Sequence, residues 1–137
     1  MPDEGKRMTS THINPGELSR PTGYTHVVTT SGRTTIYIAG QVAFDRDGVI
    51  VGPGDAKLQI EEVFTNLEIA LAAAGATFRD VVKTTTFLVG MEHLGALREV
   101  RERYFDRDNP PASTVVSVQA LARPELLVEI EAVAVLP

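Results

Sequence analysis

The 137-residue sequence contains no cysteine. This absence excludes a disulfide framework, zinc sites built on cysteine, iron–sulfur clusters and a thiolate nucleophile. There is also no tryptophan, and aromatic residues make up only 6% of the chain, which disfavours a protein that binds single-stranded nucleic acid by base stacking. His12, His26 and His93 are scattered without the paired spacing of metal ligands, so no metal site is expected.

Positive charge is also scarce, with 13 Lys and Arg against 18 Asp and Glu, a formal net charge of −5. A phosphate backbone would be repelled overall, so nucleic acid is not an expected partner. No apolar run approaches the roughly 20 residues that a membrane helix needs. The first residues, Met1 to Arg7, lack the apolar stretch of a signal peptide, so we expect no membrane association and a cytoplasmic location.

The chain length suits one domain. Residues 1–20 are polar and contain Pro15 and Gly16, so we expect a flexible lead-in followed by a single domain at residues 21–137. The stretches 24–30 and 34–39 are rich in β-branched residues and predict two strands. The break between them, Ser31 to Arg33, predicts a hairpin.

A helix is predicted between Asp55, which can cap it, and Gly75, which can end it. Its apolar residues recur at intervals of three and four: Ile60, Val63, Phe64, Leu67, Leu71 and Ala74. Such a stripe needs a partner surface, and we expect it to pack on a sheet.

The second half predicts a strand at 81–89, a helix at 92–104, and strands at 114–118 and 126–136. The order ββαβαββ predicts an α+β (mixed α/β) fold, a single mixed sheet with two helices packed on one face. The last strand is apolar on both sides, so the uncovered face of the sheet predicts an oligomer.

Glu129 and Glu131 stand out in this apolar strand, where a spacing of two places both side chains on one side. A buried carboxylate needs hydrogen-bond donors or water. Two interpretations remain open. The pair either faces solvent or structural partners, or it belongs to a pocket as an acid/base or a ligand-orienting group.

Four segments together resemble the Rid family, also called YjgF or endoribonuclease L-PSP. They are Ile36-Tyr37-Ile38-Ala39-Gly40-Gln41, the helix from Asn66 to Ala76, the strand Val81 to Leu88, and Pro111-Ala112 followed by Leu127 to Ala132. The resemblance covers residues 20 to 135. It implies a chorismate-mutase-like fold, a homotrimer with small-molecule ligands at the subunit interfaces, and hydrolysis of enamines and imines such as 2-aminoacrylate.

The resemblance also implies roles for single residues. Tyr24 matches the family's pocket tyrosine, and Gly40 matches the glycine whose backbone lines the cleft. Glu129 matches the glutamate that positions the attacking water. Tyr24 and Glu129 are therefore the catalytic candidates, and Gly40 is a substrate-binding candidate.

Three matched positions depart from the family pattern. Ser113 stands where an arginine forms a forked salt bridge to the substrate carboxylate, Val115 stands where a cysteine is found, and Arg98 stands where an asparagine is found. Serine cannot supply the bidentate, permanently charged contact of a guanidinium. Arg98 is either a solvated helix residue near Glu102 or a cation that reaches the cleft in place of the missing arginine.

These features favour a hydrolase or deaminase that acts on an imine, an enamine or a related small metabolite, with specificity altered by the loss of the arginine. The alternative is a non-catalytic trimer that binds a small metabolite or has a regulatory role. A ribonuclease is disfavoured, because no histidine pair or metal site supports it and the net charge opposes it. No cofactor is expected, since water and a general base suffice for this chemistry.

Overall fold

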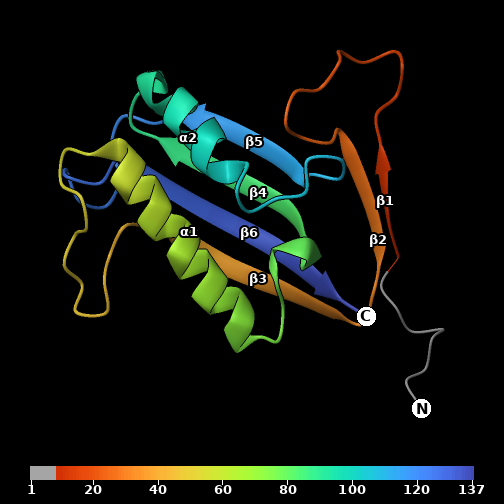
Figure 1. Cartoon of the computed structure of the whole chain (residues 1–137), viewed down its shortest axis with the longest axis horizontal. Coiled ribbons are helices and arrows are strands. Elements are labelled where there is room, and N and C mark those ends of the chain that lie inside the picture. Colours follow the sequence, from red (N-terminus) through yellow and green to blue (C-terminus); the bar gives the residue numbers. More distant parts are fainter. Residues whose placement is uncertain (1–8) are drawn as a thin grey trace.

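The computed structural model describes residues 9–137, and its centre is a four-stranded sheet in the order β3-β6-β4-β5. The strands are β3 (Thr34–Gln41), β6 (Val128–Leu136), β4 (Val81–Leu88) and β5 (Ala112–Ser117). β6 is antiparallel to both β3 and β4, whereas β4 and β5 run parallel. The sheet is therefore mixed, and the C-terminal strand lies inside it (Figure 1).

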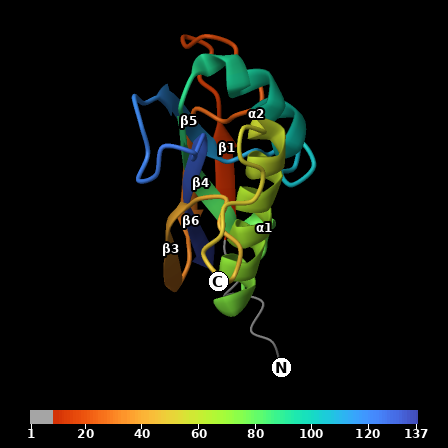
Figure 2. The same ribbon diagram turned by 90° about the vertical axis from the view of Figure 1, so that its left-hand side faces the viewer.

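Two helices, α1 (Ala56–Ala73) and α2 (Leu94–Arg101), cover one face of this sheet (Figure 2). Two short 3₁₀ helices, Phe78–Asp80 and Met91–His93, precede β4 and α2. Most of the predicted stripe of α1 is buried against alternate residues of β6, including Val128, Ile130, Ala132 and Ala134. The α+β fold with two helices on one face is confirmed.

The ends of α1 form as the sequence predicts. Asp55 precedes the helix, and its Oδ1 accepts a hydrogen bond from the Leu58 amide at 3.0 Å. Gly75 follows the helix with φ of 76°, a left-handed conformation that favours glycine. Both signals are local in sequence, so neither depended on knowing the tertiary fold.

Among the elements of residues 9–137, no helix lies on the other face of the sheet. Tyr37 lies on this face at 81% exposure, and Glu131, on the neighbouring strand, is exposed as well. Val133 lies opposite Tyr37 and is only half-buried. A large aromatic side chain in this position leaves apolar surface uncovered within one copy of the chain.

The predicted hairpin between the first two expected strands is wrong. β2 (Val27–Ser31) pairs with β1 (Thr9–Ile13), and β3 pairs with β6 instead. β1 and β2 form a separate two-stranded sheet that stands beside the main one (Figure 1). The physical reason is that the long apolar β6 offers β3 a better partner than β2, which carries Thr29 and Thr30.

β1 also lies within the segment for which the sequence predicts a flexible lead-in. Residues 1–8 are outside the described part of the chain. The strand was not expected because its residues are mostly polar, although Thr11 pairs with Thr29 and Ile13 with Val27. β-branched residues of this kind favour strands even where they are not buried.

Candidate functional site

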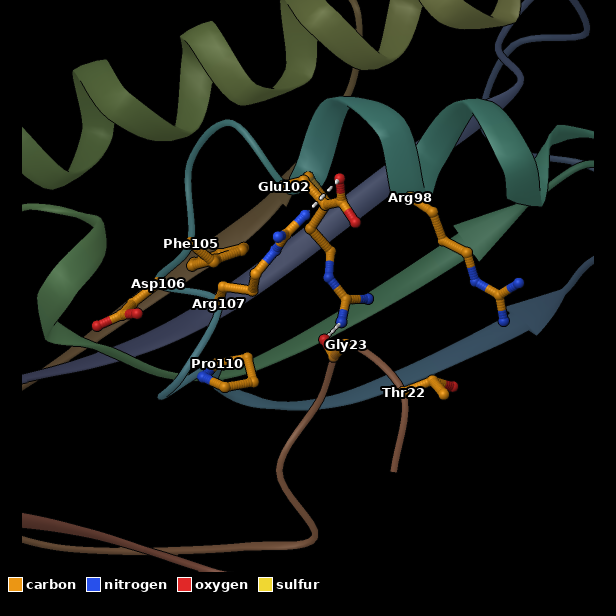
Figure 3. A pocket seen from close by; sticks show the side chains of 9 residues that line it. Thr22, Gly23, Arg98, Glu102, Phe105, Asp106, Arg107 and Pro110 are labelled. Carbon is orange, nitrogen blue, oxygen red and sulfur yellow. Dashed lines mark hydrogen bonds and ion pairs between the residues drawn. The ribbon is translucent and has the colours of Figure 1, made fainter. Parts of the chain in front are cut away.

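A cavity of about 360 Å³ lies beside α2, between the chain that follows this helix and the segment that precedes β2 (Figure 3). Its lining includes Thr22 and Gly23 from that segment. From α2 and the following chain it includes Arg98, Arg101, Glu102 and Arg107. Three of the lining side chains are guanidinium groups and two, Glu102 and Asp106, are carboxylates, so the lining carries a formal charge of three minus two, one positive, although the chain as a whole is acidic.

Thr25 fixes the segment that closes this cavity. Its amide donates to the Pro111 carbonyl at 3.3 Å, and its Oγ1 donates to the Pro110 carbonyl at 2.6 Å. Thr25 is buried, and the two bonds hold residues 22–25 against the chain that enters β5. Tyr24 lies next to Gly23 and is half-buried, with its ring 5.3 Å from that of His26 in an edge-to-face arrangement.

Arg101 contacts Ser113, the residue at which the resemblance predicts the missing arginine. Its Nη1 donates to Ser113 Oγ at 3.3 Å, and its Nη2 donates to the Gly23 carbonyl. Ser113 Oγ also accepts a hydrogen bond from Thr84 Oγ1 at 3.3 Å. Ser113 Oγ therefore accepts a hydrogen bond from a guanidinium that comes from α2.

The environment of Arg101 disfavours its charge. Burial lowers the pKa of the guanidinium below its ordinary value, and the positive charge of Arg98 lowers this pKa further. Arg98 itself is exposed and lines the same cavity. Within residues 9–137, neither arginine lies within ion-pair distance of a carboxylate, whereas Arg107 lies 3.9 Å from Glu102.

Gly40 and Glu129 form a second group, on β3 and β6. The register of these strands shifts between Ile38 and Gln41, and this irregularity brings Gly40 against the Glu129 side chain. A Cβ at position 40 would lie 2.7 Å from Glu129 Cδ and 2.9 Å from its Cγ. The close approach of the carboxylate thus explains why a glycine occupies this position.

The two glutamates of β6 differ in their surroundings. Glu129 is half-buried and lies opposite Phe87, while Glu131 is exposed and lies opposite Thr85. Glu129 is therefore the carboxylate that packs against a glycine backbone. The catalytic role that the resemblance gives to Glu129 stays a prediction.

The predicted residues do not meet in one cleft of a single chain. Ser113 pairs with Thr84 and Glu129 pairs with Phe87, three residues further along β4. Side chains at an odd spacing in a strand lie on opposite faces, so Ser113 faces the helices and Glu129 faces the open side. Val115 shares the side of Ser113 and packs against the hydrophobic core.

Sequence reasoning missed Arg101 as a site residue, although a signal was present. The apolar side of the predicted second helix consists of Leu94, Leu97, Val100 and Tyr104, and Arg101 lies among them. A charged residue beside a buried helix face needs a polar partner, and Ser113 and Gly23 are the partners here.

Among residues 9–137 there is no group of three or more His, Asp or Glu side chains that could hold a metal ion. No helix in this part of the chain is both long and apolar enough to cross a bilayer.

Comparison with known proteins identifies the family to which the chain belongs. The family model described as endoribonuclease L-PSP matches residues 17–136. A RutC family protein of Synechocystis is 37% identical over 132 residues, covering 95% of this chain and 99% of that protein. The mouse protein named 2-iminobutanoate/2-iminopropanoate deaminase is 41% identical over 101 residues, covering 74% of this chain and 73% of that protein.

A solved structure supports the same family assignment. The crystal structure of a protein of unknown function from Yersinia pestis, described as a member of the conserved Rid family, superposes with a TM-score of 0.82. It is 38% identical, and the match covers 93% of this chain and 98% of that one. The chain therefore belongs to the endoribonuclease L-PSP family, the family also called Rid.

Proposed function

We propose that the chain hydrolyses the C=N bond of a small imine, or of an enamine that tautomerises to one, with a specificity altered at position 113. The observation that carries this proposal is the contact between Glu129 and Gly40, a carboxylate held against a glycine on the open side of the sheet. The deaminase name of the mouse relative supports the reaction class. Tyr24, Gly40 and Glu129 all keep the residue types that the family resemblance expects.

The reaction needs only water and a base. The Glu129 carboxylate accepts a proton from a water molecule while the water oxygen forms a bond to the imine carbon. The π electrons of the C=N bond move to nitrogen, which takes up a proton. The hydroxyl of the resulting carbinolamine passes its proton through the Glu129 carboxylate to the amine nitrogen. The C–N bond then breaks as the C=O bond forms, which releases ammonia and the keto acid.

Gly40 supports this step by its size. With no Cβ at position 40, the Glu129 carboxylate can lie directly beside the backbone of β3. Tyr24 is assigned to substrate binding and proton delivery, because it adjoins the segment that closes the cavity. The altered specificity rests on Ser113, whose hydroxyl is already engaged by Arg101 and Thr84.

A homotrimer is part of the same proposal. Glu129 and Ser113 lie on opposite faces of the sheet, so a complete site needs groups from two copies of the chain. The exposed Tyr37 on the face without helices supports such an assembly. Light scattering should give a trimer at micromolar concentration, and a stable monomer would contradict it.

The function is tested by measuring ammonia release from imines generated in the assay by an amino acid oxidase. We expect turnover above the spontaneous rate, and slower turnover of 2-aminoacrylate than in arginine-bearing relatives. Glu129→Gln should abolish most of the activity. If the protein binds keto acids but accelerates no imine hydrolysis, it is a metabolite-binding protein and the enzymatic proposal is wrong.

A further inference from the structure

Arg98 and Arg101 lie one helical turn apart on α2, and both line the same cavity. Residues three apart on a helix are neighbours on its surface, so the two side chains leave α2 on the same side. Figure 3 shows the Arg98 side chain extending away from α2, on the side of the helix where Thr22 and Gly23 lie. The nearest other cation of the lining, Arg107, already faces Glu102.

Arg101 retains the capacity to bind an anion. A guanidinium has five N–H donors, and the structure commits one to Ser113 Oγ and one to the Gly23 carbonyl. Both acceptors are neutral, so they fix the plane of the group without compensating its charge. A carboxylate in the cavity would supply that compensation and accept two parallel hydrogen bonds.

The cavity is also larger than a short imino acid requires. A volume of about 360 Å³ lies at the lower end of the range for small-molecule sites. A three-carbon acid would leave much of this space to water. The exposed Arg98 would then have no role in holding it.

We propose that Arg101 binds the substrate carboxylate from α2 and that Arg98 binds a second carboxylate, so that the site selects imines of dicarboxylic amino acids. This inference rests on the proposed function for the reaction and adds the substrate class. Arg101 replaces the arginine that position 113 lacks, but it extends from α2 instead of from β5. Arg98 then distinguishes a dicarboxylate from a monocarboxylate.

The binding test uses two keto acids, which are the products of such reactions. Calorimetry should show that the wild-type protein binds 2-oxoglutarate at least about tenfold more tightly than 2-oxobutanoate. Arg101→Gln should weaken both ligands about tenfold to a hundredfold, the scale for loss of a charged hydrogen bond. Arg98→Gln should weaken 2-oxoglutarate about tenfold and leave 2-oxobutanoate unchanged.

Arg103→Gln is the matched control. Arg103 lies just after the end of α2. Its Nη1 is 3.4 Å from Glu61 Oε2, and the residue does not line the cavity. Affinity for both keto acids should stay at the wild-type value in this variant. Arg101→Lys keeps the charge without the planar fork and should recover only part of the lost affinity, which separates recognition from a folding defect.

Turnover separates this inference from the proposed function. If wild-type protein hydrolyses no imine but the binding pattern holds, the enzymatic proposal fails and the two-arginine site stands. Equal affinity of the wild-type protein for the two keto acids would overturn the inference, whatever the turnover. So would an Arg98→Gln variant that weakens both ligands equally, or an Arg101→Gln variant that binds as tightly as wild type.

Discussion

Replacing Gly40 with alanine should separate activity from stability. The new Cβ would lie 2.7 Å from Glu129 Cδ, so the carboxylate must move away from its position beside β3. Gly40 does not have a positive φ, and the backbone therefore accepts alanine without strain. The three heavy atoms nearest to the new Cβ all belong to the Glu129 side chain.

The surroundings of Glu129 indicate how much Gly40→Ala should change stability and activity. Glu129 is half-buried and its side chain can rotate, so an imperfect rotamer should cost about 0.5–1.5 kcal/mol of stability. Activity is more sensitive, because a displacement of a catalytic group by about 1 Å can cost about a hundredfold in rate. We expect Gly40→Ala to lower kcat at least about tenfold, with a modest change in the midpoint of urea unfolding.

Gly95→Ala is the control. Gly95 lies within α2, and a Cβ added there meets no heavy atom within 4 Å. This variant should gain about 0.5–1 kcal/mol of stability and keep full activity, because alanine is the better helix former.

A double-mutant cycle tests the reasoning itself. If Gly40→Ala acts by moving the carboxylate, it should have little further effect on kcat in the Glu129→Gln background. If Gly40→Ala lowers kcat by the same factor in the wild-type and Glu129→Gln backgrounds, this mechanism is refuted. So would a Gly40→Ala variant with wild-type kcat.

Three other predictions follow from the same structure. Glu129→Gln should lower activity by about a hundredfold or more, which is the scale for loss of a general base, whereas Glu131→Gln should not lower it. Equal losses of activity in the two variants would show that the roles of the two carboxylates have been assigned wrongly. Gln59→Leu should cost about 2–4 kcal/mol in urea unfolding, because the buried amide satisfies the carbonyls of Gly52 and Glu125 and the Leu127 amide. Ser113→Arg should destabilise the protein by about 1–3 kcal/mol by placing a second guanidinium beside Arg101, and adding Arg101→Ala should restore stability; an unchanged midpoint in the single variant would contradict this.

The elements that the sequence predicted well are those whose signals are local. The N-cap at Asp55, the glycine at 75 and the apolar stripe between them all lie within one helix. β4 and β6 were likewise located from runs of apolar and β-branched residues, within two residues of their observed ends. These features depend on neighbours in the chain.

Strand pairing could not be predicted in the same way. A break such as Ser31 to Arg33 fits two arrangements equally well. It can be the turn of a hairpin, or it can connect strands that belong to different sheets. The choice depended on β6, which lies about a hundred residues away in the chain and pairs with β3. β1 escaped notice because its partner β2 is as polar as it is, and neither shows an alternation that one buried face would impose.

The contact between Arg101 and Ser113 shows that a guanidinium beside position 113 can come from α2, twelve positions earlier in the chain. Serine at 113 is short, and the Arg101 guanidinium reaches its hydroxyl on a long aliphatic stem from α2. The Gly23 carbonyl and Ser113 Oγ orient that group, so the hydroxyl has a positioning role that an arginine at 113 would remove. Restoring the family residue at position 113 alone would therefore crowd two charges into one site, and only the paired exchange of both residues tests whether the two arrangements are equivalent.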